Sequence, residues 1–329
     1  MGADASKGYE VYDERSPQEK KEEKAPPHLL KSQMKLAALL EQKNLWAMKE
    51  LALDIGQNDM HALVNSPYND TTFCHLAVKT GSVNILAFLV NVCGANVCCT
   101  GTVFVKNERG GIVAVENATP LWLACQMGNV SLVKALVWLG AGKTSHVKTT
   151  VGSSAFQMAC YAGSLDIVQF LLENTTPVVD YNCLLAALAW NDKNHFEVAR
   201  YLIKEKWYSD VNEKDADGMT LLAWCARSGN VNGVRLLIKY DAKFTTDHKG
   251  ATPLMIAAAH GHLTTVKALL EYGDKANAKD NDGHDAVYWA SRNGHTDIAK
   301  LLLDARFRKH CGRSKGRPRP ASIFMEIDD

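Results

Sequence analysis

The sequence lacks a dominant charge and any long apolar run. Its 329 residues carry a formal net charge of +1, so no extended basic surface is expected for coating nucleic acid. Its apolar stretches are interrupted well before the roughly 18 residues that a membrane-spanning helix needs. The N-terminus opens with charged residues where a secretory signal would be apolar. These absences predict a folded protein of the cell interior that does not bind nucleic acid.

The motifs of common enzyme and metal sites are missing as well. No Gly-rich phosphate loop follows an expected strand, and no nucleophile can be paired with a base from its spacing. Nine cysteines are present, but the group Cys93, Cys98 and Cys99 lacks the paired C-x-x-C spacing of a zinc site. We therefore expect a protein that is not an enzyme and that holds no cofactor or metal.

What the chain does contain is a six-residue motif that recurs at about 33 residues or at multiples of that period. Copies begin at Thr72, Thr119, Ser154, Thr220 and Thr252. The last four lie 35, 66 and 32 residues apart, and each copy is followed by a Gly and a second apolar helix pattern. The motif and its period resemble the T-P-L-H-x-A signature of ankyrin repeats.

The physical roles of the motif residues agree with this resemblance. Thr caps the first helix, a Pro in the first turn lacks only an N–H that needs no partner, and the Gly permits a reversal into the second helix. One helix pair cannot bury its own apolar face, so pairs must stack. Small apolar side chains are expected in the first helices, where four cysteines fall and are interpreted as reduced core residues: Cys74, Cys125, Cys160 and Cys225.

These patterns predict an all-α ankyrin-repeat solenoid of about eight helix pairs. It should occupy residues 30–305, between a charge-rich mobile arm at 1–29 and a disordered tail at 306–329 that is first basic and then acidic. The insert 98–117 separates two repeats. Within it, 102–116 places two β-branched runs around a Gly-Gly turn, which predicts a β-hairpin finger beside the binding groove. The alternative is a surface loop without a role in binding.

Three further segments resemble the Fem (feminization) family, the ankyrin substrate receptors of cullin-RING ubiquitin ligases. They are the enlarged finger directly before 119–124, the segment 159–168 and the segment 218–229. The resemblance implies a protein-binding adaptor that recognises substrates and has ubiquitin-ligase components as partners. Family receptors that recognise a C-terminal Arg have acidic residues at two positions of the groove, one of them in the finger. In this chain the first position is Ala162, and the finger offers Lys106 and Arg109. This difference predicts a preference for acidic or neutral ligand ends.

Ankyrin repeats bind protein or peptide ligands on their concave face, near the Gly that ends each first helix. Basic residues outnumber acidic ones at these positions, so a ligand with an acidic or apolar-acidic segment is favoured. The alternative is that these charges form only a solvated rim. His75, His260, His262 and His295 are expected to bridge repeats by hydrogen bonds. The candidate ligand-binding residues of the groove and finger are Lys79, Lys106, Arg109, Gln126, Met127, Tyr161, Arg227, His260 and Arg292.

The two ends of the sequence carry short modification motifs. The first six residues fit the N-myristoylation pattern with Gly2 as the acceptor. Near the other end, Ser322 stands in the R-x-R-x-x-S form that basophilic kinases recognise. A second hypothesis is therefore a membrane-tethered signalling scaffold without a ligase role, and a more remote one is an enzyme that uses ankyrin packing. The expected location is the cytoplasm, with the nucleus or a peripheral membrane site as alternatives.

Overall fold

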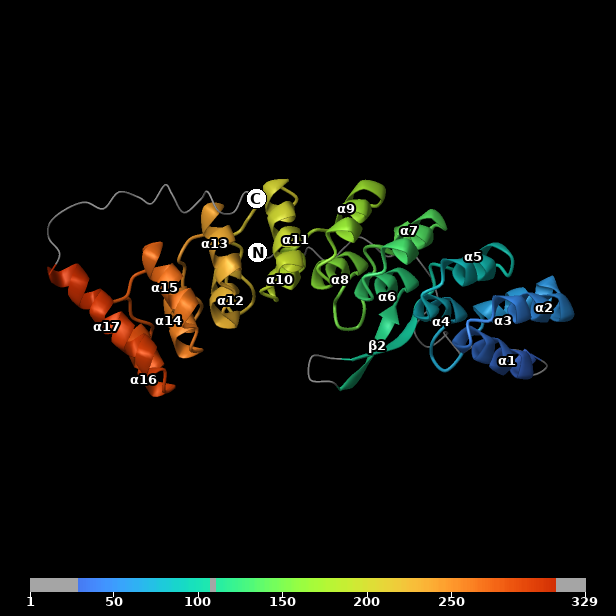
Figure 1. Cartoon of the computed structure of the whole chain (residues 1–329), viewed down its shortest axis with the longest axis horizontal. Coiled ribbons are helices and arrows are strands. Elements are labelled where there is room, and N and C mark those ends of the chain that lie inside the picture. Colours follow the sequence, from blue (N-terminus) through green and yellow to red (C-terminus); the bar gives the residue numbers. More distant parts are fainter. Residues whose placement is uncertain (1–28, 107–110, 312–329) are drawn as a thin grey trace, which may run out of the picture. The chain divides into compact units, whose positions relative to one another are not determined.

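The computed structural model describes residues 29–106 and 111–311. Helices make up nearly all of its regular structure, and the described strands form one hairpin (Figure 1). The described residues fall into two compact units. Unit 1 contains residues up to Met158 together with 169–177, and unit 2 contains 159–168 and the residues from 178 onward. Each unit is described by itself.

In unit 1, first helices pack on first helices and second helices on second helices. Helix α4 packs against α1 and α6, and α5 packs against α7. Helices α8 (Ala155–Tyr161) and α9 (Leu165–Asn174) contribute residues to both units. The other helices of unit 1 are α1 (Leu30–Glu41), α2 (Leu45–Ile55), α3 (Gln57–Asn65), α4 (Phe73–Thr80), α5 (Val83–Asn91), α6 (Pro120–Gln126), α7 (Val130–Trp138) and the short 3-10 helix η2 (Ala141–Thr144).

Unit 2 repeats the same stacking. Helices α10, α12, α14 and α16 pack in series, as do α11, α13, α15 and α17. Their bounds are α10 (Tyr181–Leu188), α11 (Lys193–Lys204), α12 (Leu221–Ser228), α13 (Val231–Lys239), α14 (Pro253–Ala259), α15 (Leu263–Glu271), α16 (Ala286–Arg292) and α17 (Thr296–Cys311). The described residues thus hold eight helix pairs and the extra helix α3, which confirms the expected fold class.

Two features of the helices differ from the sequence prediction: one additional helix and one helix end. Helix α3 was not expected, and it arises because Gly56, with φ of +88°, ends α2 and starts a new helix at once. Helix α17 does not stop at residue 305 but continues to Cys311. The sequence there contains no Gly or Pro until Gly312, so nothing in it ends the helix earlier.

The first helices begin where side chains can cap them. Thr119, Thr220 and Thr252 each accept a hydrogen bond from the backbone N–H three residues later. Repeats without this Thr use Asp instead: Asp180 accepts from Cys183 N and Asp285 accepts from Tyr288 N. An Asp cap is as effective as a Thr cap, which explains why a repeat without the motif still folds as a helix pair.

The core lies between the stacked helices. The four cysteines expected there, Cys74, Cys125, Cys160 and Cys225, are all buried, which confirms their place in the packing. None of the helices in the described ranges combines the length and the apolar character needed to cross a membrane.

The expected finger is present in unit 1. Strands β1 (Gly101–Lys106) and β2 (Ile112–Ala118) form an antiparallel hairpin in which Val103 faces Val115. Both of these valines are buried, and the hairpin extends away from α6 in Figure 1. Its base is fixed by hydrogen bonds from Thr102 N to Asp70 O (2.8 Å) and from Asn117 Nδ2 to Lys148 O (2.8 Å). The finger is therefore anchored at both strands.

Candidate ligand-binding surface

In unit 1 the candidate residues end neighbouring first helices. Lys79 is exposed in the last turn of α4, Gln126 is the last residue of α6, and Met127 is its C-cap with 43% of its surface exposed. Because α4 packs on α6, the structure brings these residues to the same end of adjacent helices. Lys106 is exposed at the end of β1. Three other predicted residues lie outside the described ranges: Arg109, Gly2 and Ser322.

In unit 2 the candidates also stand at the C-terminal ends of first helices. Tyr161 ends α8, Arg227 lies in the last turn of α12, His260 is the C-cap of α14, and Arg292 ends α16. The two arginines and the histidine are exposed. Since α12, α14 and α16 pack in series, these three basic side chains form a row along one surface.

Two side-chain groups of the same design lie on this surface. In one, Trp224 Nε1 donates to Asp215 Oδ2 (2.7 Å), and the Arg227 guanidinium lies 5.1 Å from the Trp224 ring centroid. In the other, Trp289 Nε1 donates to Asp280 Oδ2 (2.8 Å), and the Arg292 guanidinium lies 5.5 Å from the Trp289 ring. We call these the two Asp–Trp–Arg groups.

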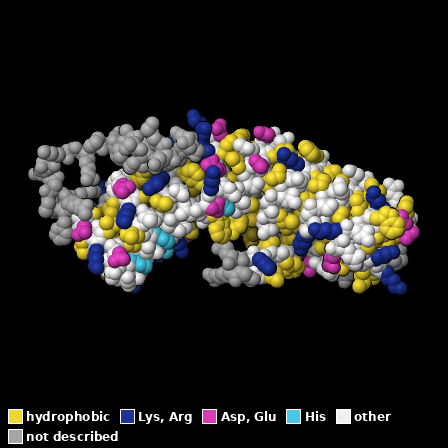
Figure 2. All heavy atoms as spheres, in the orientation of Figure 1, with side chains coloured by type: hydrophobic (Ala, Val, Ile, Leu, Met, Phe, Trp, Pro, Cys, Tyr) yellow, Lys and Arg dark blue, Asp and Glu magenta, His cyan; other side chains and the backbone are white. Residues whose placement is uncertain are grey.

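The two groups are separated by one intervening repeat. Packed helices lie about 8–10 Å apart, so the arginines stand roughly 16–20 Å apart across α12, α14 and α16. The turn that precedes α14 adds exposed His248 and Lys249. On the face shown in Figure 2, histidine side chains gather at the lower left, while basic and acidic residues are otherwise interspersed. The row from Arg227 to Arg292 therefore consists of basic side chains at the helix ends, while the turns before α12 and α16 contribute exposed Asp217 and Asp282.

The aspartates of the groups do not neutralise the arginines. Asp280 Oδ1 accepts from the backbone N–H groups of Asp282 and His284, while its Oδ2 accepts from Trp289. Burial acts to raise the pKa of Asp280, but these hydrogen bonds outweigh it and hold that pKa below its usual range. Within the described part of the chain, neither Arg227 nor Arg292 forms an ion pair. Their guanidinium groups remain available to a ligand.

Histidines hold the helix ends that carry this surface. His262 Nε2 bonds to Arg227 O (2.9 Å) and His295 Nε2 to Ala259 O (3.2 Å), which confirms both as bridges between repeats. His75 Nε2 likewise bonds to Ala118 O (3.0 Å) at the end of the finger. The expectation for His260 is wrong, because its Nδ1 bonds to Ile256 O of its own helix (2.9 Å). His260 closes the last turn of α14 instead of bridging.

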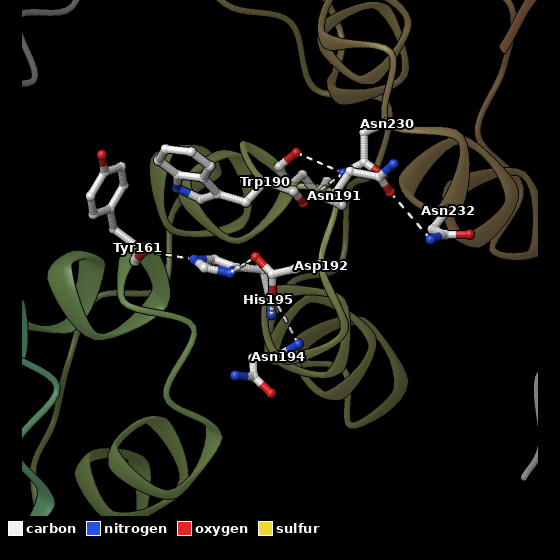
Figure 3. Close-up of polar contacts among 9 residues, drawn as sticks. Tyr161, Trp190, Asn191, Asp192, Asn194, His195, Asn230 and Asn232 are labelled. Atoms are coloured by element: carbon white, nitrogen blue, oxygen red, sulfur yellow. Dashed lines mark hydrogen bonds and ion pairs between the residues drawn. The ribbon is translucent and has the colours of Figure 1, made fainter. Parts of the chain in front are cut away.

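A further bridge involves His195, which was not predicted from the sequence. Figure 3 shows His195 reaching the backbone of Tyr161, with a distance of 2.8 Å from Nε2 to the carbonyl oxygen. Its Nδ1 lies 2.7 Å from Asp192 Oδ2. Burial raises the pKa of Asp192, but the hydrogen bonds with His195 and Asn194 bring it below its usual range. The rings of Tyr161 and Trp190 meet edge to face, 6.0 Å apart.

The comparison with known proteins decides the family. The model for ankyrin repeats (three copies) matches residues 34–146, 102–183, 121–215, 178–248 and 240–312. The chain belongs to the ankyrin-repeat family. Ankyrin repeats act as protein-binding modules, and in most proteins they carry no enzymatic activity.

Curated relatives contain more than the matched repeats. The mouse protein fem-1 homolog A-like is 29% identical over 231 residues, which cover 68% of this ankyrin chain and 33% of the relative. The human transient receptor potential cation channel subfamily A member 1 is 30% identical over 156 residues, 47% of this chain and 11% of the channel. The chain therefore spans at most about a third of the length of these relatives.

Solved structures support the same fold. The crystal structure of the human ASB11 ankyrin repeat domain superposes with a TM-score of 0.58 at 22% identity, and it covers 75% of this chain and 99% of that domain. At this identity the likeness speaks for the ankyrin fold alone.

The tryptophans and aspartates of the two Asp–Trp–Arg groups were not predicted from the sequence. Their signal is present, because both groups share the spacing of nine residues from Asp to Trp and three from Trp to Arg. In the described ranges no cluster of His, Cys, Asp or Glu has the arrangement of a metal site.

Proposed function

We propose that this protein is a protein-binding ankyrin adaptor and that the row from Arg227 to Arg292 holds an acidic segment of its ligand. The two Asp–Trp–Arg groups carry this proposal. Stacking on a Trp face restricts the guanidinium of each Arg while its N–H edge stays free to bind a carboxylate in a bidentate manner. The Asp that accepts a hydrogen bond from the Nε1–H of each Trp fixes the ring on which the Arg rests.

The separation of the two arginines suggests the shape of the ligand. An extended chain advances about 3.3–3.6 Å per residue, so a gap of roughly 16–20 Å corresponds to about five or six residues. Because side chains of an extended chain alternate between two faces, two acidic side chains six residues apart lie on one face and can contact both groups at once. His260, which lies between the two, adds a polar side chain to the same row.

Selection of displayed random peptides for binding to the full chain tests this proposal. Selected peptides should be enriched in Asp and Glu, with pairs six residues apart, and the enrichment should vanish for the Arg227→Glu, Arg292→Glu double variant. Arg235→Glu is the matched control, because Arg235 is an exposed arginine on the second helix α13. Peptides without acidic enrichment, or an equal loss with Arg235→Glu, would contradict the proposal.

The similarity to a fem-1 homolog supports a finer hypothesis, in which the chain acts as a substrate-recognition subunit related to cullin-RING ubiquitin-ligase receptors. Affinity purification with and without proteasome inhibition tests it. Cullin components should co-purify, and substrates should accumulate on the bait when the proteasome is blocked. Membrane or kinase partners without cullin components would favour the alternative hypothesis of a signalling scaffold.

The scaffold hypothesis depends on the N-terminal motif. One acyl chain on Gly2 would provide weak, reversible membrane association. Mass spectrometry of the mature N-terminus and fractionation of wild type against Gly2→Ala test it directly. A free or acetylated Gly2 would contradict it.

A further inference from the structure

A cavity of about 340 Å³ lies beside the base of the finger in unit 1. Five of the side chains that line it are polar or carry sulfur: His61, Asn65, Thr72, Asn96 and Cys99. None of the residues that line this cavity belongs to the proposed peptide-binding row. Cys99 is partly exposed and is the one sulfur-bearing side chain among the described residues that line the cavity.

Cys99 is connected to a buried histidine through a threonine hydroxyl. Thr72 Oγ1 lies 3.1 Å from Cys99 Sγ and 2.8 Å from His75 Nδ1, and His75 Nε2 lies 3.0 Å from Ala118 O. A backbone carbonyl only accepts, so His75 Nε2 carries a proton. In the neutral state Cys99 S–H donates to Thr72, whose hydroxyl donates to His75 Nδ1. If these protons move along the chain, Cys99 becomes a thiolate, His75 a cation, and every hydrogen bond is kept.

A second thiol stands next to the first. Cys74, buried in the first turn of α4, lies close enough to Cys99 for each thiol to shift the pKa of the other. The interaction with Cys74 lowers the pKa of Cys99 most, burial opposes it, and the contacts with His75 and Thr72 lower it further, so that it falls well below its usual range. The same interaction and burial raise the pKa of Cys74. The neighbouring Cys98 differs, because burial raises its pKa.

We propose that Cys99 is a covalent modification site whose thiolate attacks small electrophiles in the cavity and that hydrogen peroxide converts it into a disulfide with Cys74. In the first step the Cys99 sulfur takes one oxygen from the peroxide, the O–O bond breaks, and one water leaves. In the second step the Cys74 sulfur displaces that oxygen as a second water, and the S–S bond forms. Two thiols and one peroxide thus give one disulfide and two waters.

The order of these steps follows from access. Cys74 is buried, with 1% of its surface exposed, whereas Cys99 lines the cavity. Cys99 must therefore react first, and Cys74 resolves it. Because Cys99 directly precedes the finger and Cys74 belongs to α4, the disulfide would join the finger base to the first helix of its repeat.

The pH dependence of alkylation in the unmodified full chain tests the reactive thiol. Limiting iodoacetamide is applied from pH 6 to 8, and fragment mass spectrometry assigns the label to Cys98 or Cys99. The rate at Cys99 should change less than about twofold, whereas an ordinary thiol with a pKa near 8.5 should gain nearly tenfold per pH unit below that value. Parallel profiles for Cys98 and Cys99 would overturn the proposal.

Treatment with hydrogen peroxide tests the product. Wild type should lose two hydrogen atoms in mass and yield a peptide cross-linked between Cys74 and Cys99. Cys74→Ala should instead gain one oxygen on Cys99, which dimedone traps, while Cys93→Ala, a buried cysteine control, should behave as wild type. A cross-link through Cys93 or Cys98, or no reaction at Cys99, would overturn the proposal. Circular dichroism of each variant verifies that it has folded.

Discussion

The histidine bridges predict that two glycines in the same backbone conformation respond differently to the same substitution. Gly261 and Gly294 follow the first helices of adjacent repeats in unit 2, with φ of +80° and +82°. A Cβ atom at Gly261 would lie 2.6 Å from His295 Cε1, whereas one at Gly294 would meet no atom of the described residues within 4 Å. The two changes to Ala therefore share the backbone strain and differ in the contact with His295.

The size of the difference can be worked out from these contacts. Ala in the left-handed region costs about 1–2 kcal/mol at either position. At Gly261 the ring of His295 must also move, which breaks its bond to Ala259 O (3.2 Å), worth about 0.5–1.5 kcal/mol. Asn293 Nδ2 still donates to the same oxygen (2.7 Å), so the carbonyl keeps one partner. We expect Gly261→Ala to be less stable than Gly294→Ala by roughly 1 kcal/mol.

Urea unfolding followed by circular dichroism measures both variants. The control is a double-mutant cycle: in a His295→Ala background the two glycine variants should lose the same stability, because the clashing ring is gone. An extra loss for Gly261→Ala that persists without His295, or equal losses with it, would refute the reasoning about the bridge.

Three other predictions concern the pH response, the finger and the N-terminus. The folded protein holds the pKa of Asp280 below the value of about 3.9 that this group has in the unfolded chain. The ionised carboxylate therefore stabilises the fold above about pH 3.9, and this stabilisation is lost as the pH falls through the lower pKa of the folded state. Trp289→Phe removes one of the bonds that lower this pKa, and urea titrations between pH 6 and 2.5 should show a smaller loss of stability than in wild type. Replacing 102–116 by a short turn should leave the helical signal intact and abolish partner binding, and unchanged binding would show that the finger has no role in it. Gly2 should carry a myristoyl group in mass spectra of the mature chain, and identical fractionation of Gly2→Ala would argue against it.

The repeat pattern made the fold predictable, since the capping residues and glycines act locally. Thr119, Thr220 and Thr252 cap helices where the motif places them. The valine-rich strands β1 and β2 pair as the predicted hairpin. Helix α3 was missed because its start depends on the backbone conformation of Gly56, which an apolar pattern does not reveal.

The site was less predictable because its contacts join distant residues. The sequence identified Arg227 and Arg292 from their position before a Gly, but not the tryptophans on which they lie or the aspartates that hold those rings. His260 shows the opposite failure, since its place beside a Gly suggested a bridge while its ring turns back to Ile256. The contact between Cys99 and Thr72 spans 27 residues and follows from the path of the chain into the finger.

The central claim is that Arg227 and Arg292 together bind two acidic groups of one ligand. The most direct measurement is calorimetry of the full chain with an extended peptide that carries two glutamates six residues apart. An exposed ion pair contributes up to about 1 kcal/mol, so Arg227→Ala and Arg292→Ala should each weaken binding about fivefold, and Arg235→Ala should not. A peptide whose glutamates are only two residues apart should bind the wild-type protein about as weakly as the first peptide binds a single arginine variant. Equal affinity in all four proteins, or affinity independent of glutamate spacing, would contradict the account.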